Sequence, residues 1–256
     1  MIPKVIHYCW FGGKPLPEFA KKCIASWKKY CPGYEIKEWN ESNFDINSCT
    51  YVKEAYSSKK YAFVSDYARF DILYQHGGLY FDTDVELIKP IGEIIDRGAF
   101  MGIEASSIGE ESAEKNPAAL GLGVVVNPGL GIAAEANMEI YKEILDFYHT
   151  IHFINPDGSL NLETVVSYTT KILFKHGLEV RDGIQKVGGI TVYPQEYFNP
   201  CDIRTRKITV TEKTVSIHHY AGSWLSKKEK FKQFVRKIVG NKVYLFLYDM
   251  KHKRKK

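Results

Sequence analysis

The sequence predicts an α/β fold, in which strands and helices alternate along a chain of 256 residues. Residues 4–10 (KVIHYCW) and 34–39 (YEIKEW) have the composition of strands, and residues 17–30 between them read as a helix. The chain therefore opens with a β–α–β unit. Residues 60–86 continue the alternation with a second helix and a further strand. The hydrophobic content of 45% is enough for one large domain with a sizeable core.

The most informative stretch is residues 60–86, KYAFVSDYARFDILYQHGGLYFDTDVE. It predicts a helix over residues 61–75, because aromatic residues recur there at helical spacing. These residues form one stripe: Phe63, Tyr67, Phe70 and Tyr74. Gly77 and Gly78 supply the left-handed backbone geometry at which helices commonly end. Residues 79–81 (LYF) are short, apolar and aromatic, which predicts a buried strand.

Two carboxylates, Asp82 and Asp84, follow that strand where it leaves the sheet. Residues i and i+2 of a strand point the same way, so their like charges repel unless a cation lies between them. A hard divalent ion such as Mn²⁺ or Mg²⁺ meets that need. The alternative is an acidic turn after a strand, and a motif as short as D-x-D leaves it open.

The preceding helix carries a charged pair, Asp66 and Arg69, at i and i+3 on one face. As an exposed ion pair it would contribute only about 0.2–0.5 kcal/mol. Its place on the helix that leads into the two aspartates favours a role in the same site.

Residues 99 to 210 are expected to complete the sheet and its helical cover. Strands are predicted at residues 99–103, 122–126, 190–193 and 208–210, and helices at 137–150 and 161–176. Residues 104–119 are small, acidic and polar, which is typical of a mobile loop. The turn NPGLG at residues 127–131 lets backbone approach a ligand closely, with Asn127 as a further candidate contact.

A second informative stretch, VSIHHYAGSW, covers residues 215–224. A neutral imidazole here can bind the metal. His218 and His219 are the two candidates for that ligand. The alternative is a purely structural role, with the two histidines at a strand end and Trp224 in the core.

The last thirty residues differ in charge from the rest. Residues 227–256 hold twelve of the 35 Lys and Arg residues and only two of the 30 acidic residues, which leaves the preceding 226 residues mildly acidic. We expect a domain at 1–226 and an amphipathic basic tail at 227–256, with an anionic membrane surface as its partner. The alternative is a docked C-terminal helix.

The five cysteines are odd in number and contain no C-x-x-C motif, which favours reduced thiols. No stretch approaches the ~18 apolar residues of a membrane span, and residues 1–4 (MIPK) do not begin a charged segment followed by an apolar one. We therefore expect a cytoplasmic protein, held at the inner face of the plasma membrane through its tail.

The motifs S-D-x-x-R and G-G-x-Y-x-D-x-D at residues 65–84 resemble those of the family described as the glycosyltransferase sugar-binding region containing the DXD motif, glycosyltransferase family 32. That family includes initiating mannosyltransferases and capsular-polysaccharide enzymes. The glucosyltransferase domains of large clostridial toxins share the same segment. The resemblance implies a GT-A fold with a Rossmann-like nucleotide-binding sheet and flanking helices. It also implies a nucleotide-sugar donor, linked to UDP or GDP, and Mn²⁺ or Mg²⁺ as cofactor.

The resemblance also implies roles for single residues. Trp10, in W-F-G-G, would lie on the nucleotide base, and Asn43 would approach the ribose or base. Donor-sugar contacts would come from the 65–80 segment: Ser65, Asp66, Arg69 and Tyr80. Asp84 and His219 would ligate the metal, and Asp82 would hold the metal shell or the ribose and sugar hydroxyls. Trp224 would reach the donor phosphate.

The implied reaction is retaining transfer of a hexose to a glycan or lipid-linked oligosaccharide, in capsule, exopolysaccharide or lipopolysaccharide synthesis. No nucleic-acid partner is expected. One alternative is a non-catalytic sugar- or membrane-binding module on the same fold. Another is a phosphohydrolase of the haloacid-dehalogenase type, but that class has Thr two residues after the second Asp, where this chain has Glu86.

Overall fold

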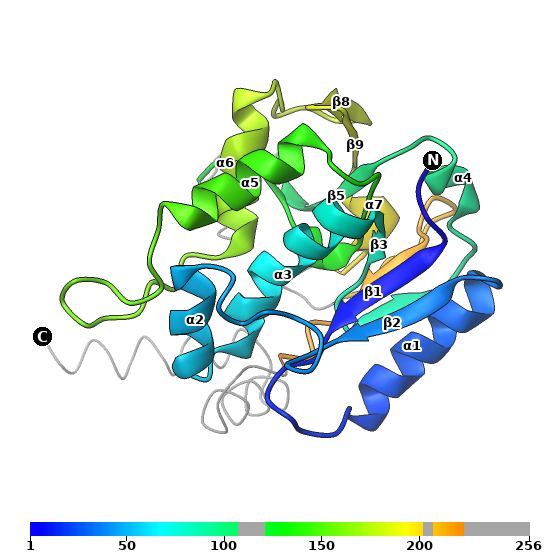
Figure 1. Cartoon of the computed structure of the whole chain (residues 1–256). Coiled ribbons are helices and arrows are strands. Elements are labelled where there is room, and N and C mark those ends of the chain that lie inside the picture. The colour runs from blue at the N-terminus through cyan, green and yellow to red at the C-terminus, as the bar shows by residue number, and fades with distance from the viewer. Residues whose placement is uncertain (107–120, 202–206, 223–256) are drawn as a thin grey trace, which may run out of the picture.

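A mixed β-sheet with helices on both faces forms the body of the protein in the computed structural model, which describes residues 1–106, 121–201 and 207–222 (Figure 1). Seven strands lie in the order β2 (Glu35–Trp39), β1 (Val5–Cys9), β3 (Gly78–Tyr80), β7 (Ile132–Ala134), β5 (Phe100–Ser106), β9 (Ile190–Tyr193) and β8 (Gln185–Val187), and β6 (Val124–Val126) pairs with β5. β1 is parallel to β2 and β3, and β5 is parallel to β9, whereas β7 and β8 run antiparallel to their neighbours. The predicted α/β class is confirmed.

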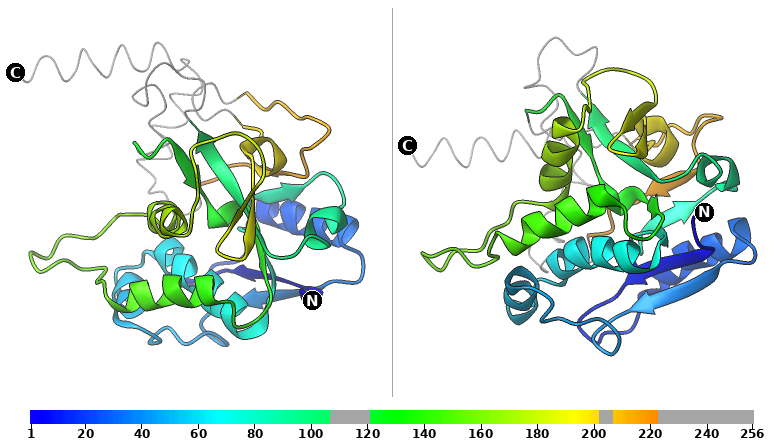
Figure 2. Two further views of the ribbon diagram at one scale, coloured as in Figure 1. Left: turned by 90° about the horizontal axis from the view of Figure 1, so that it is seen from above. Right: turned by 45° about the horizontal axis from the view of Figure 1, so that its top comes forward.

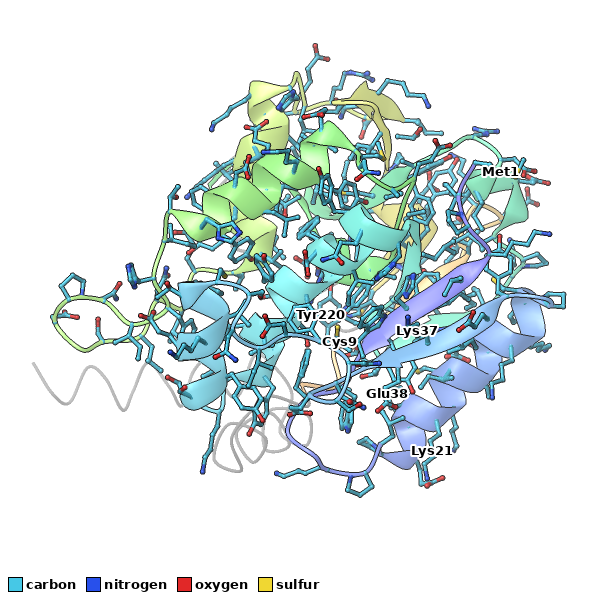
Figure 3. The ribbon with its side chains drawn as sticks, in the orientation of Figure 1. Met1, Cys9, Lys21, Lys37, Glu38 and Tyr220 are labelled. Atoms are coloured by element: carbon cyan, nitrogen blue, oxygen red, sulfur yellow. The ribbon has the colours of Figure 1, made fainter. Side chains whose placement is uncertain are left out.

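The opening β–α–β unit forms as predicted. Helix α1 (Glu18–Tyr30) packs on one face of the sheet, where Ile24 and Trp27 meet Ile6 of β1 in one apolar cluster. The Trp27 indole N–H also donates to the Val85 carbonyl at 2.8 Å. Side chains on the outer face of α1, such as the labelled Lys21, point away from the body (Figure 3).

The opposite face of the sheet is covered by α3 (Tyr61–His76), with α2 (Thr50–Ser57), α5 (Glu139–His149) and α6 (Val165–Lys175) around it. Helix α3 ends at Gly77, whose φ of 63° is in the left-handed region, as predicted. Of the predicted aromatic stripe, Tyr67 and Phe70 are buried, whereas Phe63 and Tyr74 are only partly buried. Burial extends beyond that stripe because neighbouring elements enclose α3 on several sides.

A short antiparallel ribbon of β4 (Val85–Leu87) and β10 (Ser216–His218) stands beside the main sheet. Its register sets His218 opposite Val85, so the end of the described chain lies next to the two aspartates that follow β3. This ribbon was not predicted, because its strands have three residues each and pair only in the tertiary structure.

Other sequence expectations hold in part. Residues 208–210 do not form a strand, since Ile208 makes only an isolated bridge to Cys201. Residues 104–106 of the predicted 104–119 loop belong to β5, and the rest of that loop lies outside the described residues. The predicted turn at residues 127–131 contains the 3₁₀ turn η3 (Pro128–Leu130), whereas the short helices α4 (Gly92–Ile95) and α7 (Gln195–Phe198) were not predicted. The predictions for Trp224 and for the 227–256 tail concern residues outside the described ranges.

The loop between α5 and α6 projects from the body in all views (Figures 1 and 2). Glu54 of α2 holds the start of this loop, because its carboxylate accepts hydrogen bonds from the backbone N–H groups of Phe153 and Ile154. The five cysteines, all within the described ranges, form no disulfide. Among the described residues, no helix is both long and apolar enough to cross a membrane.

Candidate active site

Three ligand-type side chains meet where β3 leaves the sheet and the β4–β10 ribbon begins. Atoms of Asp82, Asp84 and His218 lie within 4.8 Å of one another. Asp82 and Asp84 are on the turn between β3 and β4, and His218 is the last residue of β10. Two carboxylates and an imidazole form a donor set that suits Mn²⁺ and is compatible with Mg²⁺. The residues present therefore fit the divalent ion that the D-x-D motif implies.

The histidine at this site is His218, and the expectation of His219 is corrected. His218 Nε2 lies 3.1 Å from Asp84 Oδ1. His219 instead directs its Nε2 to Glu86 at 2.8 Å and packs edge-on against Phe19. Consecutive residues of an extended chain point to opposite sides, so only one of the two histidines can face the aspartates.

The charges of this cluster are tightly linked. Burial acts to raise the pKa of Asp84, but the His218 imidazole and the Ala221 N–H, which donates to Asp84 Oδ2 at 2.8 Å, outweigh it and hold that pKa below its usual value. Burial acts to lower the pKa of His218, but Asp84 outweighs it and the pKa is raised. The two shifts favour the charged forms of both groups, a carboxylate beside an imidazolium, when no metal is bound. A divalent ion would take the place of that proton.

A second charged group, centred on Arg69, lies against the first. Arg69 is 3% exposed, and its Nη2 is 2.7 Å from Asp66 Oδ1 and 3.3 Å from Asp82 Oδ1. Its guanidinium also lies over the Tyr80 ring at 5.1 Å, and the Tyr80 hydroxyl donates to Asp82 Oδ1 at 3.0 Å. These four residues come together as expected, and the pair on α3 is buried rather than a surface ion pair.

Burial decides the ionisation of the two carboxyls that Arg69 contacts. It raises the pKa of Asp66 to about 6, against the opposing effect of Arg69. It also raises the pKa of Asp82, again against Arg69. Asp66 is therefore poised to take up a proton close to neutral pH.

The turn at residues 127–131 supports Asp82 directly. A Cβ added to Gly129 would lie 2.3 Å from Asp82 Oδ2, so the glycine is required by the carboxylate itself. The Asn127 side chain accepts a hydrogen bond from the Gly129 N–H at 2.6 Å and holds the turn in place. The sequence predicted close backbone approach here, and the structure shows Asp82 as the group approached.

Trp10 and Asn43 lie at the carboxyl ends of β1 and β2, which pair side by side. The Trp10 indole N–H donates to the Lys14 carbonyl at 2.6 Å. The Asn43 side chain donates to the Glu38 carbonyl and accepts from the Asn40 N–H, so both of its polar groups serve the local turn. Ser65 donates its hydroxyl to the Tyr61 carbonyl within α3.

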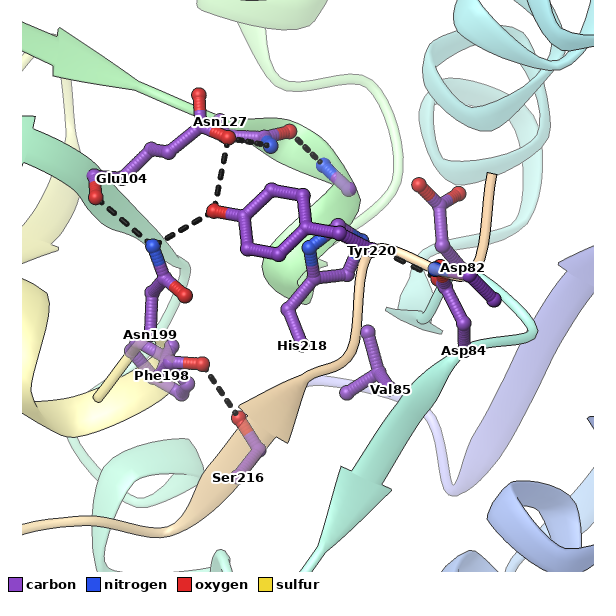
Figure 4. A network of polar contacts seen from close by, with 12 residues as sticks. Asp82, Asp84, Val85, Glu104, Asn127, Phe198, Asn199, Ser216, His218 and Tyr220 are labelled. Atoms are coloured by element: carbon purple, nitrogen blue, oxygen red, sulfur yellow. Dashed lines mark hydrogen bonds and ion pairs between the residues drawn. The ribbon is translucent and has the colours of Figure 1, made fainter. Parts of the chain in front are cut away.

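Three further residues near His218 were not predicted: Glu104, Asn199 and Tyr220. The Tyr220 hydroxyl donates to Glu104 Oε1 at 2.9 Å and accepts from Asn199 Nδ2 at 2.7 Å (Figure 4). The sequence placed Glu104 in a polar, acidic loop and gave no indication of a role for Asn199 or Tyr220. No periodicity could have found them, because β10 ends at His218 and Tyr220 has a left-handed φ of 50°, so alternation along an extended chain does not place its side chain.

Comparison with known proteins identifies the segment that carries most of this site. Residues 17–101 match the family model described as "Glycosyltransferase sugar-binding region containing DXD motif". An uncharacterized glycosyltransferase, L373, of Acanthamoeba polyphaga mimivirus is 32% identical over 106 residues, which cover 39% of this chain and 42% of that protein. Inositol phosphoceramide mannosyltransferase 1 of Schizosaccharomyces pombe is 28% identical over 115 residues, which cover 42% and 36%.

Among solved structures, the PaToxG glycosyltransferase is similar with a TM-score of 0.49 and 20% sequence identity, over 68% of this chain and 69% of that one. The chain spans less than half the length of the two curated relatives it matches. The matched segment, residues 17–101, includes Asp66, Arg69, Asp82 and Asp84 but neither Trp10 nor His218.

Proposed function

We propose that this protein is a metal-dependent hexosyltransferase that takes its sugar from a nucleotide donor linked to UDP or GDP. One observation carries the proposal. The two aspartates of the D-x-D motif meet His218 in a cation-binding arrangement, beside a buried Arg69, within a segment that matches a glycosyltransferase sugar-binding region. The mixed sheet with helices on both faces is compatible with a GT-A fold, which is part of the proposal.

Asp82, Asp84 and His218 would hold Mn²⁺ or Mg²⁺. The bound ion would supply Lewis-acid stabilisation of the negative charge that develops on the leaving diphosphate. Asp84 is prepared for this role because its pKa is below the usual value, so it is ionised at neutral pH. The Tyr80 hydroxyl, which donates to Asp82, fixes the direction of the other carboxylate.

Asp66 and Arg69 would bind hydroxyl groups of the donor sugar. The guanidinium is held between two carboxylates and over the Tyr80 ring, so its orientation is set before any ligand arrives. A preorganised donor of this kind binds and orients with little loss of side-chain freedom. Transfer with retention of the anomeric configuration belongs to the proposal through the family resemblance.

Trp10 would offer its ring face to the nucleotide base at the carboxyl end of β1, where ligands bind in open α/β sheets. Asn43 and Ser65 are proposed as further contacts to the donor. Their described hydrogen bonds lie within their own turn and helix. Trp224 remains a proposed contact to the donor phosphate.

The acceptor is proposed to be a glycan or a lipid-linked oligosaccharide in the synthesis of a surface polysaccharide. The relative named inositol phosphoceramide mannosyltransferase supports mannose as the transferred sugar and a lipid-linked acceptor. A cytoplasmic enzyme whose basic tail at 227–256 meets an anionic membrane would have access to such an acceptor.

The test is a panel of UDP- and GDP-sugars, each assayed for hydrolysis and for thermal stabilisation with Mn²⁺ and with EDTA. We expect one donor to stabilise and be hydrolysed only with the metal. Asp84→Asn should abolish that response while keeping the fold, as checked by circular dichroism. Metal-independent turnover would contradict the proposal. Donor binding without any turnover would favour a non-catalytic sugar-binding module.

A further inference from the structure

The backbone of Tyr220 is in an uncommon conformation. Its φ is 50°, in the left-handed region that bulky side chains rarely adopt. Such conformations persist only where surrounding contacts over-determine them, and they cluster at functional sites. Tyr220 lies two residues after His218, immediately beside the proposed metal centre.

Among the described residues, Glu104 and Asn199 hold the tyrosine hydroxyl, although both are distant from it in the chain. Its hydroxyl donates to Glu104 Oε1 on β5 at 2.9 Å and accepts from Asn199 Nδ2 after α7 at 2.7 Å (Figure 4). The partners are themselves tied together, because Asn199 Nδ2 also donates to the Glu104 carbonyl at 2.8 Å. Asn127 Nδ2 reaches the same Glu104 carboxylate at 3.2 Å.

Residues on both sides of Tyr220 contact the proposed metal ligands. The Tyr220 ring packs edge-on against the His218 imidazole, with ring centroids 4.2 Å apart. The next residue, Ala221, donates its N–H to Asp84 Oδ2. The orientation of Tyr220 therefore constrains His218 through its ring and Asp84 through the following peptide.

We propose that Tyr220 is a positioning residue for the metal centre, oriented by Glu104 and Asn199. This role depends on the metal site of the proposed function, and it identifies Tyr220 as a group that sets the geometry of the ligands. Partners that orient metal ligands typically change metal affinity by 10–100-fold when they are lost. Without its hydroxyl, Tyr220 loses its hydrogen bonds to Glu104 and Asn199, so the ring and the Ala221 N–H are no longer held in place through them.

The test compares Tyr220→Phe with Tyr141→Phe. Tyr141 is a matched control because it is a fully buried tyrosine of α5 whose hydroxyl donates to the Ala133 carbonyl at 3.3 Å, away from the metal residues. Mn²⁺ is titrated into each protein, and free Mn²⁺ is measured by electron paramagnetic resonance. We expect the Kd for Mn²⁺ to rise roughly tenfold in Tyr220→Phe and to stay within about twofold in Tyr141→Phe. A Kd for Tyr220→Phe within that same twofold range would overturn the proposal.

Glu104→Ala gives a second route should Tyr220→Phe not fold. It leaves the tyrosine intact but removes its acceptor, and it should also weaken Mn²⁺ binding. When both changes are combined, the loss should be no greater than the larger single loss, because both act through one contact. If the two increases in Kd multiplied, the two residues would act independently, and the proposed action of Glu104 through Tyr220 would be rejected. Failure of the unmodified protein to bind Mn²⁺ would reject the metal site itself, whereas normal binding with unaffected variants would reject only the role of Tyr220.

Discussion

Asp84 Oδ1 and His218 Nε2 lie 3.1 Å apart, although one residue follows β3 and the other ends β10. The antiparallel pairing of β4 with β10 brings them together, since its register sets His218 opposite Val85. The same register sends His219 to the other side, toward Glu86. A contact between two three-residue strands thus decides which of two adjacent histidines belongs to the candidate metal centre.

Replacing each histidine by alanine separates their roles. We expect His218→Ala to weaken Mn²⁺ binding by more than about tenfold, because it removes a ligand rather than an outer partner. His219→Ala loses only its contacts with Glu86 and Phe19, and its Mn²⁺ affinity should stay within about threefold. Isothermal titration with Mn²⁺ measures both variants. The reverse ranking would restore His219 as the ligand.

Arg69→Ala should destabilise the fold strongly. Arg69 is buried, and its removal leaves the partly buried carboxyls of Asp66 and Asp82 without their cation; breaking a buried pair typically costs about 3–5 kcal/mol. Arg181→Ala is a suitable control because Arg181 forms an exposed pair with Glu179, worth about 1 kcal/mol or less. Urea unfolding followed by circular dichroism measures both. If both variants lost the same free energy of unfolding, burial would not be what makes the Arg69 ion pairs stabilising.

The stability of the protein should depend on pH through Asp66. Its pKa is about 6 in the folded protein, against an ordinary value of 3.8 for an aspartate in an unfolded chain. Between these two values the folded state binds a proton that the unfolded state has released. The contribution of Asp66 to stability is therefore present below pH 4 and is lost as pH rises through 6.

Asp66→Asn carries no such proton. The stability of the unmodified protein relative to this variant should fall by up to about 3 kcal/mol between pH 4 and pH 7. Parallel urea unfolding curves across this range measure the difference. If the difference in free energy of unfolding between the two proteins stayed constant with pH, the pKa of Asp66 in the folded protein would not be raised.

Gly129→Ala should disturb Asp82 without replacing any of the proposed metal ligands. The added Cβ would meet Asp82 Oδ2 at 2.3 Å, so either the carboxylate or the turn must move, at a cost of about 1–3 kcal/mol. Gly92→Ala, where nothing lies within 4 Å, provides the control and should be neutral or slightly stabilising. In Gly129→Ala we expect a lower Tm in thermal unfolding and a weaker affinity in Mn²⁺ titration. Unchanged Mn²⁺ affinity would mean that Asp82 does not need its present position to bind metal.

Local patterns in the sequence were sufficient for the features that depend on neighbouring residues. The opening β–α–β unit, helix α3 with its glycine end, and the joint placement of Asp66, Arg69, Tyr80 and Asp82 all follow from periodicity and from the short path between α3 and β3. These groups are close in the chain, so their geometry is largely set by one helix, one turn and one strand.

Tertiary structure alone decided the features that depend on distant pairings. The family resemblance of residues 215–224 indicated a histidine as partner of the D-x-D aspartates, but the β4–β10 register selected His218. The sequence likewise contained Glu104, Asn199 and Tyr220 without any pattern to link them, because β5, the end of α7 and the end of β10 meet only after the sheet has formed. The physical reason is that a strand of three residues carries too little periodicity to specify its partner or its facing side, and both are fixed by the packing of the elements around it.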